Sequence, residues 1–305
     1  MKIIRVLIVT LMILAACAPV FGMGGKPVAG RGVPTVAVSI VPQAYFVGRI
    51  AGDRIRVITL VGPGQNPHSY EPTPRQMADL STASLWFTVG VEFENALLPK
   101  VASLYPGIRL VDTISGIRFR SLEGKPYNDD GDNDGAIDAD HDEGGRDPHV
   151  WLGHESVKIQ VGHILNALLA LDPAGASVYR NNRDAFIREI DTLFNGLAAE
   201  LVPLRGKPAF VYHPSFGYFL DEFGIVQEAV ETGGKEPTQK GLAALIGRAR
   251  ADGARVIFVQ PQFPVSAAGT VAAAIGGSVV QIDALAADWL LNIKIMADAL
   301  RAAVR

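Results

Sequence analysis

The sequence predicts an α/β fold of two lobes, each with a mainly parallel sheet flanked by helices, bridged by one long rigid α-helix. Three observations support this prediction. Short β-branched runs alternate with helical segments in each half of the chain, which is the pattern of parallel sheets covered by helices. The second half repeats the order of elements in the first half. Between the halves lies a helical region in which Gly and Pro are sparse.

The first half contains four short apolar runs that predict strands, over residues 35–41, 56–61, 85–89 and 109–112. A helix is expected over 44–51, and the Pro- and Gly-rich segment 63–67 predicts a loop. Thr73 followed by Pro74 is typical of a helix start, with a hydroxyl N-cap and a proline in the first turn.

The second half follows the same plan. Strands are expected over 208–212, 255–259 and 278–282, and a short helix over 216–223. The triplet Glu236-Pro237-Thr238 repeats Glu71-Pro72-Thr73, and a helix should follow each. Four elements that recur in the same order indicate two lobes of similar design.

The region between the halves predicts two helices. Apolar residues recur at helical spacing over 155–171, and a second apolar stripe runs from Tyr179 to Leu197. Asp172 is interpreted as an N-cap before Pro173, so the second helix should cover about 28 residues and about 40 Å. The expected division is an N-terminal lobe over 33–172, a linking helix over 173–203 and a C-terminal lobe over 204–305.

Residues 1–25 are interpreted as an export signal that takes no part in the fold. Lys2 and Arg5 precede an apolar stretch up to Ala16, and small residues follow. The single cysteine, Cys17, ends a Leu-Ala-Ala-Cys sequence that resembles a lipobox, so it is a candidate lipidation site; alternatively the signal is cut further on, near Gly22. Either reading places the domain in the periplasm or on the outer face of the cytoplasmic membrane, and a lone cysteine allows no disulfide.

The charge distribution gives no electrostatic case for nucleic acid. The net charge is −3, whereas nucleic-acid binding requires a basic surface. Residues 128–143 carry eight acidic and no basic side chains, which leaves 23 acidic against 28 basic residues elsewhere. This segment is therefore expected to be an acidic loop in an otherwise mildly basic protein.

Three of the six histidines share a sequence context that predicts a metal site. His68 and His149 each follow a proline. His213 closes a predicted strand and is followed by a proline, Pro214. Ligands of open α/β sheets bind beyond the carboxyl ends of strands, and imidazole is a common metal ligand. We therefore expect the three to converge in the cleft between the lobes. His163 lies within the 155–171 helical region and His154 lies at its start, and both are interpreted as structural.

Five segments resemble the motifs of the zinc/manganese solute-binding proteins of ABC transporters. Three contain the histidines: 66–74 (NPHSYEPTP), 147–152 (DPHVWL) and 212–219 (YHPSFGYF). The other two, 258–263 and 280–285, resemble strands of the C-terminal lobe in that family. The resemblance implies a two-lobed fold bridged by a rigid helix, and Asp283 as a fourth ligand.

The resemblance also implies a function and a partner. Manganese-type members carry Glu where His213 stands, and imidazole-rich sites suit Zn²⁺, so the bound ion is expected to be Zn(II). Glu71 or a water molecule are alternatives to Asp283, which could instead be a helix N-cap. The expected partner is an ABC permease, and the protein is expected to be a monomer and not an enzyme. A Mn(II) protein of the same type, a zinc metallohydrolase and a metal-stapled surface adhesin remain the alternatives.

The acidic loop admits three interpretations. It stands where zinc-type members often insert a His-rich segment, but its only histidine is His141. Asp130, Asp132 and Asp134 also fit the first positions of an EF-hand-type Ca²⁺ loop. The loop is either a solvated segment, a weak secondary zinc site for delivery, or a calcium site.

Overall fold

A computed structural model describes residues 32–122, 145–231, 238–263 and 265–303, and residues 33–305 form one compact unit. The expectations for the export signal with Cys17 lie outside the described residues. The same holds for the acidic loop 128–143, with His141, Asp130, Asp132 and Asp134.

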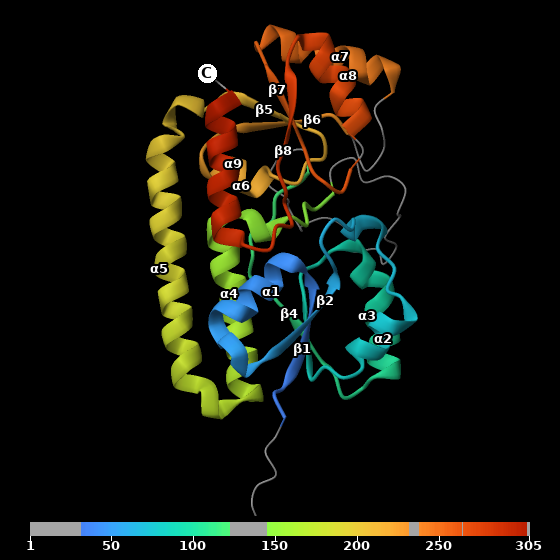
Figure 1. The fold of residues 1–305 in the computed structure, drawn as a ribbon, viewed down its shortest axis with the longest axis vertical. Helices are drawn as coiled ribbons and strands as arrows, with labels where there is room; N and C mark the ends of the chain where they lie inside the picture. Colours follow the sequence, from blue (N-terminus) through green and yellow to red (C-terminus); the bar gives the residue numbers. More distant parts are fainter. Residues whose placement is uncertain (1–31, 123–144, 232–237, 264, 304–305) are drawn as a thin grey trace, which may run out of the picture. The chain divides into compact units, whose positions relative to one another are not determined.

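The first half of the chain forms a four-stranded sheet in the order β2-β1-β3-β4, and all neighbouring strands are parallel. Its strands are β1 (Thr35–Ile40), β2 (Arg56–Val61), β3 (Leu85–Thr88) and β4 (Arg109–Asp112). The central strand β1 is buried from Val36 to Ile40, because helices cover both faces of the sheet (Figure 1). The four strands predicted from the sequence are confirmed.

The second half forms a second parallel sheet in the order β6-β5-β7-β8, which repeats the order of the first. Its strands are β5 (Pro208–Val211), β6 (Val226–Ala229), β7 (Val256–Val259) and β8 (Ser278–Gln281). The sequence did not predict β6. It is a half-exposed edge strand with two polar residues among four, so its side chains carry no buried apolar run. The two-lobed α/β fold is confirmed.

Helices flank both sheets. They are α1 (Val41–Ala51), α2 (Pro74–Leu80), α3 (Glu92–Leu104), α4 (His154–Leu171), α5 (Ala176–Glu200), α6 (Gly217–Glu222), α7 (Gln239–Ala251), α8 (Val265–Ile275) and α9 (Trp289–Ala303). The Thr73 side chain makes a reciprocal capping box with Gln76, and the Thr238 hydroxyl caps α7 by accepting from the Gly241 backbone N–H. A helix therefore follows each Pro-Thr pair, as predicted.

The long helix α5 covers 25 residues, about 37 Å at 1.5 Å per residue. Asp172 stands at the N-cap position of a 3₁₀ turn with Pro173 first, as predicted, but its side chain makes no cap hydrogen bond, and α5 itself begins only at Ala176. Its carboxylate instead accepts from Arg54 (2.7 Å) and from the Tyr179 hydroxyl (2.6 Å). A 3₁₀ turn (Pro173–Gly175) therefore separates the two helices.

No single helix among the described residues has the length and apolar character to cross a membrane. Helices α4 and α5 meet the combined criterion of length and composition only as a pair, and that pair is bent by 119°.

Aromatic packing joins α5 to both halves of the molecule. The Phe46 ring on α1 lies 5.5 Å from Trp289 on α9, and both contact Phe186 on α5. The Trp289 indole donates to the Trp151 carbonyl oxygen, and the Trp151 indole donates to the Ala284 carbonyl oxygen, each over 2.7 Å. This buried layer thus contacts, through Trp151, the segment that carries His149.

Candidate metal centre

Three separate segments bring the predicted histidines together. His68 lies in a 3₁₀ turn (Pro67–Ser69) after β2, where its backbone N–H donates to the Asn66 side chain (2.9 Å). His149 directly precedes a second 3₁₀ turn (Val150–Leu152), and His213 lies two residues beyond β5. Each has one ring nitrogen within 4.8 Å of the corresponding atoms of the other two. The predicted convergence of His68, His149 and His213 is therefore present in the structure.

The histidines surround a cavity of about 20 Å³, enough for a single ion or water molecule. His149 and His213 are 2% and 6% exposed, and His68 is partly exposed. The cavity is lined by Pro67, His68, His149, Trp151, His213, Ser215, Gln260, Gln262, Phe263, Ala284 and Leu285. The Phe263 ring stacks on His213 at 4.6 Å between centroids, so one side of the site is apolar.

Each histidine is paired with a carboxylate at Nδ1. His68 faces Glu92 at 2.8 Å and His149 faces Asp147 at 2.7 Å. His213 faces both oxygens of Glu231, at 3.2 and 3.3 Å. Carboxylates that accept from one ring nitrogen fix the tautomer and orientation of a metal-binding imidazole. The Nδ1 atoms therefore carry the protons, and the Nε2 lone pairs are free.

The Nε2 atoms of His149 and His213 lie 3.3 Å apart. Two nitrogen lone pairs at this distance repel unless a proton or a cation lies between them. Zinc–nitrogen bonds of 2.0–2.1 Å at a tetrahedral angle place two ligand nitrogens about 3.3 Å apart. The donor set thus fits a tetrahedral cation without rearrangement of this pair.

Electrostatics favour the ionised form of two of the carboxylates, Glu92 and Asp147, and the neutral form of the His213 imidazole. Burial alone would raise the pKa of Glu92, but the hydrogen bond from His68 and several smaller favourable interactions together lower the pKa to about 2. Burial opposes ionisation of Asp147 as well, yet His149 and Arg120 hold its pKa below the usual range. Burial lowers the pKa of His213 to about 4, against the opposing hydrogen bond to Glu231. A neutral His213 is the form that binds a metal.

Metal-free protein should lose stability through His213 as the pH falls. Its pKa is about 4 in the folded state and 6.5 ordinarily, so between these values only the unfolded chain binds the proton. The contribution of neutral His213 to the free energy of unfolding is on the order of 3 kcal/mol. It is fully present above pH 6.5 and is lost as the pH falls towards 4. Urea unfolding midpoints from pH 7.5 to 4.5 measure it. His213→Gln should flatten this part of the profile, and an unchanged profile in that variant would contradict the assignment.

Asp283 lies near the site but outside the three-histidine group. Its Oδ1 atom accepts from the Gln262 side chain and from the Leu285 backbone N–H, each at 2.9 Å. Its two successors in the chain, Ala284 and Leu285, line the cavity. Glu71 is exposed and is also outside the group formed by the described residues.

The other two described histidines make local contacts. His154 Nε2 lies 2.8 Å from Asp191 Oδ1, and its ring stacks on Phe194 at 4.7 Å. His163 Nε2 lies 2.9 Å from the Ser115 carbonyl oxygen. Neither joins the three-histidine group.

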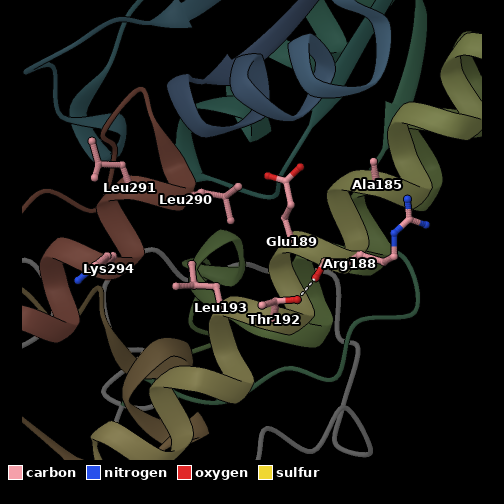
Figure 2. Close-up of a pocket in the computed structure, with 8 residues that line it drawn as sticks. All are labelled: Ala185, Arg188, Glu189, Thr192, Leu193, Leu290, Leu291 and Lys294. Carbon is pink, nitrogen blue, oxygen red and sulfur yellow. Dashed lines mark hydrogen bonds between the residues drawn. The ribbon is translucent and has the colours of Figure 1, made fainter.

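A larger groove, of about 620 Å³, lies between α5 and α9 (Figure 2). It is lined by Ala185, Arg188, Glu189, Thr192, Leu193, Leu290, Leu291 and Lys294. Figure 2 shows that its one carboxylate, on Glu189, has no histidine or second acid beside it among these residues. The groove therefore lacks the donor set of a metal site. The candidate metal centre is identified by its three imidazoles, although its cavity is much smaller than this groove.

The carboxylates at Nδ1 were not predicted as functional residues. Asp147 lies within the quoted histidine motif, two residues before His149, so the motif itself carried a signal. Glu92 begins α3, and Glu231 follows β6, far from any histidine in sequence. Only the parallel sheets bring their strand ends, and hence these two acids, to the imidazoles.

The chain resembles known proteins over most of its length. Residues 36–303 match the family ZnuA, zinc-uptake complex component A, periplasmic. A crystal structure of ZnuA superposes with a TM-score of 0.80 at 34% identity and covers 90% of this chain and 100% of its own.

Two relatives from Streptococcus pneumoniae are more distant. The zinc-binding lipoprotein AdcA of strain R6 is 26% identical over 78% of this chain and 47% of its own length. The manganese ABC transporter substrate-binding lipoprotein PsaA of strain TIGR4 is 28% identical over 72% of this chain and 68% of its own. The chain thus spans about half the length of AdcA. The family match over residues 36–303 shows that this chain belongs to the ZnuA family of periplasmic zinc-uptake components.

Proposed function

We propose that the protein captures Zn²⁺ outside the cytoplasmic membrane and delivers it to an ABC permease for import. The observation that carries this proposal is the pair of Nε2 atoms 3.3 Å apart, each on a ring fixed by a carboxylate at Nδ1. This pair, with His68, forms a preorganised three-imidazole donor set. Membership in the ZnuA family supports the link to import.

The donor set favours zinc over manganese. Imidazole nitrogens suit Zn²⁺, whereas Mn²⁺ prefers oxygen-rich sites. Relatives of both kinds match this chain, so the relatives alone do not decide the ion. The chemistry of His68, His149 and His213 supports the assignment of Zn(II).

Asp283 is the proposed fourth ligand. Its carboxylate is half-buried and is held by Gln262, whose side chain lines the cavity. A ligand contact requires Asp283 to exchange the Gln262 hydrogen bond for the metal. Glu71 or a water molecule are the alternative fourth donors.

Ligand withdrawal is the proposed route of release. His68 and His149 come from the N-terminal lobe, and His213 and Asp283 from the C-terminal lobe, so separation of the lobes would divide the donor set. Cys17 is the proposed point of lipid attachment, and the acidic loop with His141 is a proposed secondary zinc-collecting segment.

Two other classes of function use the same donor set differently. A metallohydrolase keeps one coordination position open for water beside a general base, whereas three imidazoles and a carboxylate fill a tetrahedral site. A structural zinc would be required for folding. Reversible binding of one ion distinguishes transport from both.

Metal analysis of the purified protein tests the proposal. One zinc per chain is expected by elemental analysis, removable with a chelator and restored on addition of Zn²⁺. Chelator competition should give a lower Kd for Zn²⁺ than for Mn²⁺. Tighter binding of Mn²⁺ would overturn the zinc assignment, and absence of any stoichiometric metal would overturn the function.

A further inference from the structure

We propose that Arg120 is a positioning residue that couples the metal-site histidine His149 to the segment carrying His213. The proposal rests on the proposed function in metal capture. Arg120 touches neither imidazole ring. It acts through Asp147 on one side and through Asp221 of α6 on the other.

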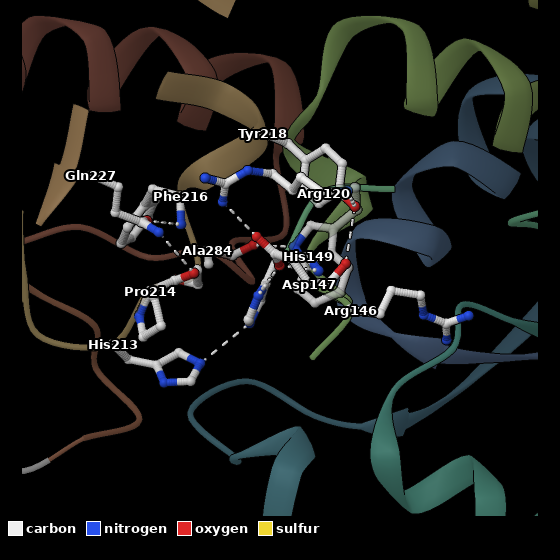
Figure 3. A network of polar contacts seen from close by, with 12 residues as sticks. Arg120, Arg146, Asp147, His149, His213, Pro214, Phe216, Tyr218, Gln227 and Ala284 are labelled. Atoms are coloured by element: carbon white, nitrogen blue, oxygen red, sulfur yellow. Dashed lines mark hydrogen bonds and ion pairs between the residues drawn. The ribbon is translucent and has the colours of Figure 1, made fainter. Parts of the chain in front are cut away.

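A single carboxylate serves both His149 and Arg120. Asp147 Oδ1 accepts from His149 at two points, the backbone N–H (2.9 Å) and Nδ1 (2.7 Å). Asp147 Oδ2 accepts from Arg120 Nη1 at 2.7 Å. Figure 3 shows the guanidinium and the imidazole on opposite sides of this carboxylate (Figure 3). The orientation of the His149 ring is therefore tied to the place of the Arg120 side chain.

Arg120 also contacts α6. Its Nε atom lies 2.8 Å from Asp221 Oδ2, an ion pair without hydrogen-bond alignment. Its backbone N–H donates to the Tyr218 hydroxyl (3.3 Å), and that hydroxyl donates to the Asp147 carbonyl oxygen (3.0 Å). Helix α6 begins at Gly217, four residues after His213. The network thus joins the backbone at Asp147, in the segment of His149, to the Tyr218 and Asp221 side chains of α6, in the segment that follows His213.

Gly217 makes the close approach of the guanidinium possible. A Cβ atom at this position would overlap Arg120 Nη1 and Cζ. Both Arg120 and Asp147 are buried, at 7% and 0% exposure, so neither charge can turn to water in its place. A buried contact therefore links Asp147, which orients His149, to α6, the helix that follows His213.

The coupling has a thermodynamic consequence. A metal that holds His149 and His213 together favours the arrangement in which Arg120 contacts both Asp147 and Asp221. By linkage, that contact favours the metal-bound state and slows its opening. Removing the contact should therefore speed metal dissociation more than it changes association.

Three variants test the proposal by zinc affinity, chelator-driven dissociation rate and the visible spectrum of the Co²⁺-loaded protein. Arg120→Met should weaken zinc binding about 10- to 100-fold, as for other residues that orient metal ligands. Asp221→Asn removes only the α6 partner, which is half exposed, and should speed dissociation about two- to fivefold.

Arg146→Met is the matched control. It removes the same charge next to Asp147 in sequence, but Arg146 packs on the Phe119 ring (4.6 Å) and points away from the Asp147 carboxylate (Figure 3). Its zinc affinity and dissociation rate should stay within about twofold of the wild-type values, the smallest effect expected for an exposed charge.

The outcomes separate coupling from a purely structural role. A stability loss in Arg120→Met with unchanged zinc affinity, dissociation rate and Co²⁺ spectrum would overturn the proposal. If Arg120→Met fails to fold, Asp221→Asn decides, and an unchanged dissociation rate overturns the coupling. Wild-type protein that binds no zinc would overturn the proposed function itself, whereas zinc-binding wild type with wild-type-like Asp221→Asn defeats only the coupling.

Discussion

Replacing His213 with alanine is expected to weaken zinc binding more than about a hundredfold. Residues that merely orient a metal ligand cost 10- to 100-fold when they are replaced, so loss of a ligand itself should exceed that range. The variant removes one of the two nitrogens that lie 3.3 Å apart and leaves Glu231 buried beside an empty volume. Competition with a zinc chelator at pH 7.5 measures the change in Kd.

His163→Ala is the matched control for this variant. It removes an imidazole on α4 whose Nε2 atom lies 2.9 Å from the Ser115 carbonyl oxygen and which is outside the three-histidine group. Its zinc affinity should remain at the wild-type value. Equal losses in the two variants would remove the assignment of His213 as a ligand.

The elements predicted from the sequence carry a local apolar signal. Strand β1 was predicted from a β-branched run, and helix α5 from apolar residues at helical spacing. The edge strand β6 was missed because its four residues, Val-Gln-Glu-Ala, contain no apolar run. Asp172 takes the predicted N-cap position, but its carboxylate accepts from Arg54, 118 residues away in sequence, and this long-range contact takes the place of the local cap hydrogen bond.

The site shows the same division between local and long-range information. Proline-flanked histidines are local features, and they converge as expected. Their carboxylate partners are distant in sequence, except for Asp147, and depend on the order of strands in each sheet. Nothing in the neighbourhood of Glu92 or Glu231 in the sequence identifies them as partners of an imidazole.

Zinc at a thousandfold excess over its Kd is expected to raise the melting temperature of the protein by about 8–16 °C. Binding to the folded state alone at this excess contributes about 4 kcal/mol. In a domain of roughly this size each kcal/mol corresponds to about 2–4 °C. Differential scanning calorimetry of metal-free and zinc-loaded protein measures the shift, and His213→Ala should lose most of it.

The metal-free protein should nevertheless stay folded, because the core is independent of the centre. The layer of Phe46, Phe186 and Trp289 packs α1, α5 and α9 together without any metal-site residue. Val36 to Ile40 of β1 and Ile257 of β7 are likewise buried within their own sheets. Native-like circular dichroism and a cooperative transition are therefore expected after chelation. Unfolding on chelation would instead indicate a zinc that staples the fold, and would favour a structural surface protein over a component that must bind and release its ion.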